Sequence, residues 1–102
     1  MKLLTKGDLK RLPPLGSQAE VGDPVLFVKF FTPDGGWTWF AAEGSAGEEA
    51  GEFVFWGYVI GVESEWGTFA LSELESVRGA LGLPVERDRY FQPQPFSALK
   101  RE

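Results

Sequence analysis

Cysteine, histidine and asparagine are all absent from this 102-residue sequence, and its one methionine is residue 1. Without cysteine there are no disulfides, thiolate nucleophiles or thiolate metal sites. Without histidine the commonest general base and the commonest zinc ligand are missing. We therefore expect no metal site and no cofactor, and we lean against an enzyme without deciding the question. Scarcity of thermolabile residues is typical of thermophilic proteins, but drift in a GC-rich genome gives the same composition, and both explanations stay open.

Long apolar runs are also lacking. No stretch approaches the roughly 20 residues that cross a bilayer, and residues 1–6 lack the apolar segment of a signal peptide. We expect a cytoplasmic protein without membrane contact. The length fits a single domain spanning residues 1–102.

Basic residues are missing from the middle of the chain. Residues 43–75 hold eight glutamates and no lysine or arginine, whereas the two ends are net basic and the whole chain carries −5. The ends could fold beside the middle and neutralise it, or the asymmetry could serve a partner; the first interpretation is favoured.

Glycine-rich phosphate-binding motifs are absent as well. With phosphate contacts disfavoured by the acidic balance, we expect no binding to nucleic acid.

The apolar and aromatic segments predict an α+β domain built on one four-stranded antiparallel meander. The predicted strands are residues 25–32, 37–43, 53–63 and 67–71. Residues 33–36 carry the proline, aspartate and glycine typical of hairpin turns, and residues 64–67 predict a second turn because Gly67 suits a left-handed position. The small and acidic residues 44–51 predict a mobile connection.

Two capping patterns predict helices, one before the predicted strands in the sequence and one after them. Thr5 with Asp8 three residues later predicts a short N-terminal helix, and Ser72 with Glu75 predicts a helix after the last strand. Residues 80–99 are punctuated by glycine and proline and predict an extended tail. Because the strands are apolar on both faces, we expect this tail to pack on the sheet.

Aromatic side chains on the predicted sheet form the first candidate binding site. They are Trp37, Trp39, Trp56 and Tyr58. Gly57 and Gly61 lie four residues apart on one strand, where glycine often marks a close approach by another group. A tryptophan of another strand could cover them, which is the favoured interpretation. They could instead form a platform that stacks a base or sugar or docks a partner.

Charged side chains form two further candidates. Arg87 and Arg89 could grip a phosphate or carboxylate, but pairing with neighbouring acids is the favoured interpretation. Carboxylate pairs could act as acid and base or bind a divalent cation, yet capping and solvent explain them better. These carboxylates are Glu63, Glu65, Glu73 and Glu75.

Several motifs resemble a small bacterial family that is known only as a domain of unknown function, number 2958. They are MKLLTK at residues 1–6, RLPPL at 11–15, VKFFTP at 28–33, WTW at 37–39, LSELESVRG at 71–79 and GLPVERD at 82–88. The resemblance runs over nearly the whole chain. It implies a stand-alone bacterial cytoplasmic protein and implies no activity.

Taken together, the residues favour a non-enzymatic protein-interaction module, because an aromatic sheet occurs without catalytic residue types. The expected partner is another protein or a second copy of the chain. The alternative is a small-ligand-binding protein or an enzyme that uses arginine and glutamate side chains. A concave pocket that gathers an arginine and two carboxylates would favour this alternative.

Overall fold

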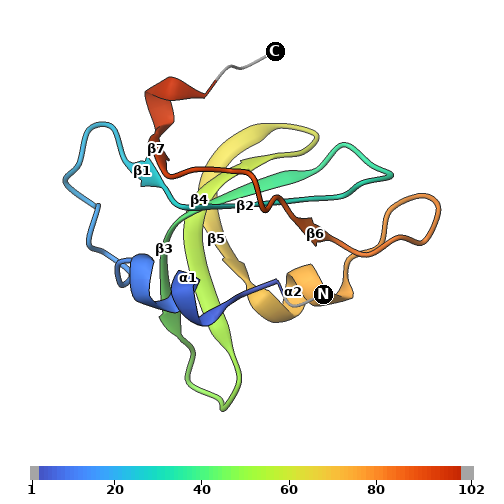
Figure 1. Cartoon of the computed structure of the whole chain (residues 1–102), viewed down its shortest axis with the longest axis horizontal. Coiled ribbons are helices and arrows are strands. Elements are labelled where there is room, and N and C mark those ends of the chain that lie inside the picture. The colour runs from blue at the N-terminus through green and yellow to red at the C-terminus, as the bar shows by residue number, and fades with distance from the viewer. Residues whose placement is uncertain (1–2, 100–102) are drawn as a thin grey trace.

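A computed structural model describes residues 3–99, which form an α+β domain with two antiparallel sheets. The large sheet has the strand order β5-β4-β3-β2-β6, and β1 pairs with β7 in a small second sheet (Figure 1). The elements are α1 (Lys6–Arg11), β1 (Val25–Leu26), β2 (Val28–Phe31), β3 (Thr38–Ala46), β4 (Phe53–Ile60), β5 (Ser64–Ala70), α2 (Leu71–Ser76), β6 (Glu86–Arg87), β7 (Gln94–Pro95) and the 3₁₀ turn η1 (Phe96–Ala98). No helix in this part of the chain is long and apolar enough to span a bilayer.

The predicted meander is confirmed, but the sheet has five strands rather than four. The fifth, β6, comes from the segment predicted as a tail: Phe30 pairs with Arg87 and Phe31 with Glu86. A strand of two residues is too short to show the alternation that identifies strands in a sequence. The prediction of four strands was therefore wrong in this detail.

The first predicted strand is divided between the two sheets. Leu26 pairs with Gln94 of β7, whereas Val28 pairs with Ala41 of β3. Between them, the Phe27 N–H donates to the Ala41 carbonyl at 2.8 Å. Next to that point the β3–β4 register shifts between Ala41 and Glu43, so the irregularity in β3 coincides with the change of partner in the first strand.

The second predicted hairpin turn was misplaced. The chain turns at residues 61–63, and the predicted turn lies inside β5, where Gly67 pairs with Gly57. β3 also continues to Ala46, so the predicted connection 44–51 begins as strand. Glycine and acidic residues favour turns in general, but here the cross-strand partners decide the register.

The N-terminal cap of α1 agrees with the prediction from the sequence, and the N-terminal cap of α2 differs from it. The Asp8 N–H donates to the Thr5 hydroxyl and the Thr5 N–H donates to the Asp8 carboxylate, as predicted. In contrast, α2 begins at Leu71, before Ser72. The Ala70 N–H donates to the Glu73 carboxylate at 2.8 Å. The predicted Ser72 cap is therefore wrong, and Glu73 rather than Glu75 is the capping acid.

The two faces of the large sheet are covered by different parts of the chain. On the helix face, Phe30 and Phe55 pack with Leu12 and Leu74 from the helix segments and with Val85. The opposite, tail face packs against the C-terminal segment, with Phe40, Tyr58 and Trp66 of the sheet meeting Phe91, Phe96 and Leu99. Figure 1 shows the helices and the C-terminal segment on opposite sides of the strands. The expected packing of the tail is confirmed.

Two neighbouring aromatic residues provide a matched test of this packing. The Phe91 ring lies 5.6 Å from the Phe40 ring, whereas Tyr90 is 84% exposed. Phe91→Ala should lower the free energy of unfolding by about 1–3 kcal/mol, because it removes a large side chain from the tail face. Tyr90→Ala should change it by less than about 0.5 kcal/mol. Equal effects in urea titrations would contradict the assigned packing.

Candidate functional site

The six candidate binding residues do not gather at one place. Trp39 packs on the helix face, and Trp56 and Tyr58 lie on the tail face. Arg87 and Arg89 lie in the segment around β6, where both line a surface hollow. A sequence shows that aromatic residues occur on strands, but the division between faces depends on the strand register.

Trp37 and Trp39 stack with their ring centres 5.9 Å apart. Atoms of the Trp37 ring lie 2.3–2.5 Å from where a Cβ of Gly61 would stand, so Gly61 leaves the space that the indole fills. At Gly57 the close neighbour is instead the Phe40 carbonyl oxygen, 1.7 Å from such a Cβ. Both glycines are thus explained by contacts within the chain.

A second aromatic group lies beside β5 and includes a residue that sequence reasoning missed. The Trp56 and Trp66 rings stack with centres 4.6 Å apart, and Trp66 also contacts the rings of Tyr58 and Phe96. Both tryptophans are only half-buried. Trp66 was missed because its segment was taken for a turn.

The strand that carries Trp66 is an edge of the large sheet, and half of its backbone groups point away from β4. In an antiparallel ladder, residues alternate between those that bond the neighbouring strand and those that do not. The Gly61 N–H donates to the Glu63 carbonyl at 3.0 Å, which places the odd-numbered residues of β5 among those that bond β4. Ser64, Trp66 and Thr68 therefore direct their N–H and C=O groups outward.

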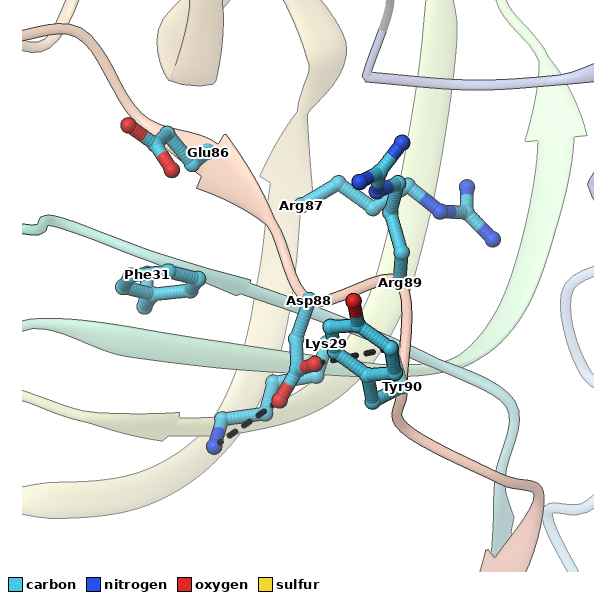
Figure 2. A pocket seen from close by; sticks show the side chains of 7 residues that line it. All are labelled: Lys29, Phe31, Glu86, Arg87, Asp88, Arg89 and Tyr90. Atoms are coloured by element: carbon cyan, nitrogen blue, oxygen red, sulfur yellow. Dashed lines mark hydrogen bonds and ion pairs between the residues drawn. The ribbon is translucent and has the colours of Figure 1, made fainter.

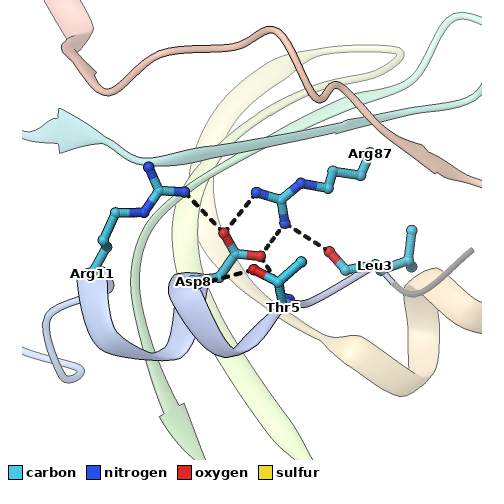
Figure 3. Close-up of polar contacts among 5 residues, drawn as sticks. All are labelled: Leu3, Thr5, Asp8, Arg11 and Arg87. Atoms are coloured by element: carbon cyan, nitrogen blue, oxygen red, sulfur yellow. Dashed lines mark hydrogen bonds and ion pairs between the residues drawn. The ribbon is translucent and has the colours of Figure 1, made fainter.

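Arg87 is held inside the fold. Its guanidinium donates to both carboxylate oxygens of Asp8 and to the Leu3 carbonyl, and Arg11 donates to Asp8 at 3.0 Å (Figure 3). Asp8 is fully buried. Burial raises the pKa of Asp8, but the hydrogen bonds from Arg87, Thr5 and Arg11 outweigh it and bring this pKa to about 2. Arg87 is thus an ion-pair residue, but the expected pairing with neighbouring acids was wrong, because its partner Asp8 is buried and lies near the other end of the sequence.

Beyond this ion pair, the chain around β6 borders a surface hollow of about 340 Å³ (Figure 2). Lys29 lies 3.6 Å from the Asp88 carboxylate, and Arg87 is bound to Asp8. Arg89 forms no ion pair or side-chain hydrogen bond within residues 3–99, and its side chain is exposed. The hollow thus brings together two arginines and the two carboxylates Glu86 and Asp88. Of its cations, Arg89 is the one without an ion-pair partner among residues 3–99.

The glutamates proposed as alternatives lie in ordinary surroundings. Glu73 caps α2, and Glu63, Glu65 and Glu75 are exposed. No three acidic side chains come together as a metal site in the described part of the chain.

A buried carboxylate that the sequence did not reveal lies at Glu43. It is 3% exposed, and the backbone N–H groups of Gly16 and Gln18 donate to its two oxygens at 2.6 Å each. Glu43 borders a hollow of about 430 Å³ together with Trp56 and Thr68. The available signal was a glutamate at the end of the predicted strand 37–43, but a lone glutamate near glycines usually lies in solvent.

Comparison with known protein families gives a match that covers most of the chain. The model of a family described as a protein of unknown function, DUF2958, matches residues 3–99. The chain belongs to this family. The predicted family resemblance is therefore confirmed, and it assigns no activity to the DUF2958 fold described above. No curated protein and no solved structure matches the chain.

The Asp8–Arg87 pair predicts a defined pH dependence of stability. Asp8→Asn removes a buried charge that Arg87 requires, so the free energy of unfolding should fall by about 3–5 kcal/mol at pH 7. Because the folded pKa of Asp8 lies below its ordinary value of 3.8, the stabilisation is complete above that value and is lost as pH falls toward about 2.

Denaturant titrations between pH 2 and 7 measure this difference directly. The gap between the wild type and Asp8→Asn should narrow below pH 4. Asp88→Asn is the control, because its partly exposed pair with Lys29 contributes about 1 kcal/mol or less. A gap that stays constant down to pH 2 would show that the charge of Asp8 is unimportant.

Proposed function

We propose that this protein is a non-enzymatic protein-interaction module that binds an extended strand of its partner along β5. The observation that carries the proposal is the outward backbone of β5, next to the half-buried Trp56–Trp66 stack. Added strands gain affinity from main-chain hydrogen bonds and specificity from neighbouring side-chain pockets. The family resemblance supports a bacterial cytoplasmic setting.

The two edges of the large sheet differ in how well they are protected. Natural sheets protect edges with very short strands, proline, lysine or bulges. β6 is two residues long, which fits such protection. β5 has seven residues, contains neither proline nor lysine, and pairs with β4 without a register shift. An edge of this kind is an attractive template for another strand.

Side chains beside β5 could supply the specificity. The hollow of about 430 Å³ is bordered by Leu15, Trp56 and Thr68, so an apolar side chain of the partner strand could enter it from the edge. Tryptophan is enriched among binding hot spots, which lie where the partner buries it most fully. The edge and the hollow together form one surface on the tail face.

A proline at Thr68 tests this surface without removing a bond to β4. The Thr68 N–H points outward, and proline is tolerated at such positions of edge strands. Thr68→Pro should abolish capture of host proteins that the wild type enriches from a lysate, and Thr68→Val, which keeps the N–H, should retain them. Mass spectrometry identifies the captured proteins, and circular dichroism confirms folding. Equal capture by both variants would contradict binding along β5.

The hollow next to β6 favours a second function, binding of a small anion. Its support is the guanidinium of Arg89, which has no ion-pair partner among residues 3–99 and lines the hollow together with Arg87 and Lys29. Calorimetric titration with inorganic phosphate should then show binding that Arg89→Gln weakens at least about 10-fold, because a charge-assisted hydrogen bond is lost. An unchanged affinity in this variant would remove the second function.

A further inference from the structure

Glycines within the long strands fall into two groups. A Cβ at Gly44 would lie 2.5 Å from the Phe53 ring, and a Cβ at Gly57 would meet the Phe40 carbonyl oxygen at 1.7 Å. A Cβ at Gly67 would meet no described atom within 4 Å. Gly67 also lacks the positive φ that would require glycine. Nothing within residues 3–99 therefore explains a glycine in the middle of this strand.

A glycine inside a strand weakens the strand and often marks a place where another backbone approaches closely. Gly67 lies at the centre of β5, between the outward-pointing residues Trp66 and Thr68. Within residues 3–99, β4 pairs with the inner side of β5 and no strand pairs with its outer side, so the approaching backbone would belong to another chain. The unexplained glycine and the unprotected edge thus point to the same place.

We propose that a second copy of the chain pairs antiparallel with β5 about a two-fold axis at Gly67, which joins two five-stranded sheets into one. The inference rests on the proposed function, since both use the outer edge of β5. It adds the identity of the partner and the register of the pairing.

This register satisfies the backbone groups on the outer edge. With Gly67 opposite Gly67 of the partner subunit, Trp66 lies opposite Thr68 of the partner subunit, and the reverse pair follows from the symmetry. These are the residues whose N–H and C=O groups point outward, so each pair can exchange two hydrogen bonds. The glycines themselves form a pair without hydrogen bonds, where Cα atoms come within about 4.5 Å and side chains would be closest.

Side chains in the same register are compatible with a copy of the chain. Glu65 lies opposite Phe69 of the partner subunit, so the acid of the strand does not face its own copy. Trp66 lies opposite a β-branched threonine, a favourable type of cross-strand pair. Each Trp56–Trp66 stack then lies beside the new strand, where the pairing would bury more of its half-exposed area. In a pair of identical chains the two-fold axis fixes these cross-strand pairs. A strand from another protein has a different sequence, so no symmetry would place compatible side chains opposite β5.

The pairing is expected to be weak. A strand edge with a few flanking side chains buries less than the roughly 1,000 Å² of a stable interface, so we expect a dissociation constant on the order of 10–100 µM. Sedimentation velocity of the full chain between about 1 µM and 1 mM covers this range. The wild type should shift from monomer to dimer over these concentrations.

Charge variants at Gly67 test the axis itself. Because open space surrounds this position, Gly67→Lys and Gly67→Glu should both fold, which circular dichroism checks. Only an axis at residue 67 places each new charge opposite its own copy, and like charges opposite one another weaken pairing. Each variant alone should dimerise at least about 5-fold more weakly than the wild type, and an equimolar mixture should dimerise more tightly than either.

Two results would overturn the inference. Either a wild type that stays monomeric at 1 mM or a mixture no tighter than the separate variants excludes the axis at Gly67. If Thr68→Pro still abolishes capture of a host protein in the first case, the proposed function stands and the partner is a different protein. If that capture is also unaffected, both proposals fail.

Discussion

The fold depends on the buried ion pair between Asp8 and Arg87, which joins segments from the two ends of the sequence. Asp8 caps α1 through Thr5, and Arg87 belongs to β6, so one carboxylate fixes both the first helix and the last strand of the large sheet. Taking both charges out of water is costly, and the pair is stable only because several donors share the carboxylate. The helix and the strand are therefore stable together rather than separately.

The two edges of the large sheet differ. β6 is held against β2 at one edge, while the opposite edge, β5, is longer and has outward backbone groups at Trp66 and Thr68. The helix face is covered by Leu12, which follows α1, and by Leu74 of α2, and the tail face is covered by Phe91 and Phe96. The edge of β5, with the tryptophans next to it, is the surface that we propose for a protein partner.

Local signals in the sequence predicted much of this fold. The Thr5–Asp8 capping box and the turn at residues 33–36 are complete within a few residues, so they can be recognised without the tertiary structure. β6, the burial of Glu43 and the partner of Arg87 depend on residues far away in the chain, and no local pattern contains them. The candidate site was predicted only in part for the same reason: Trp56 was named, but Trp66 was hidden in a segment that resembled a turn.

Amide hydrogen exchange along β5, followed by NMR at low and high protein concentration, tests most directly whether its open edge recruits another strand. The N–H groups of Gly67 and Phe69 bond β4 and should be protected at every concentration, whereas those of Trp66 and Thr68 should exchange rapidly in dilute samples and slow down as the concentration rises. Exchange at Trp66 and Thr68 that is slow in dilute samples, or that is independent of concentration and of added partner, would contradict the account.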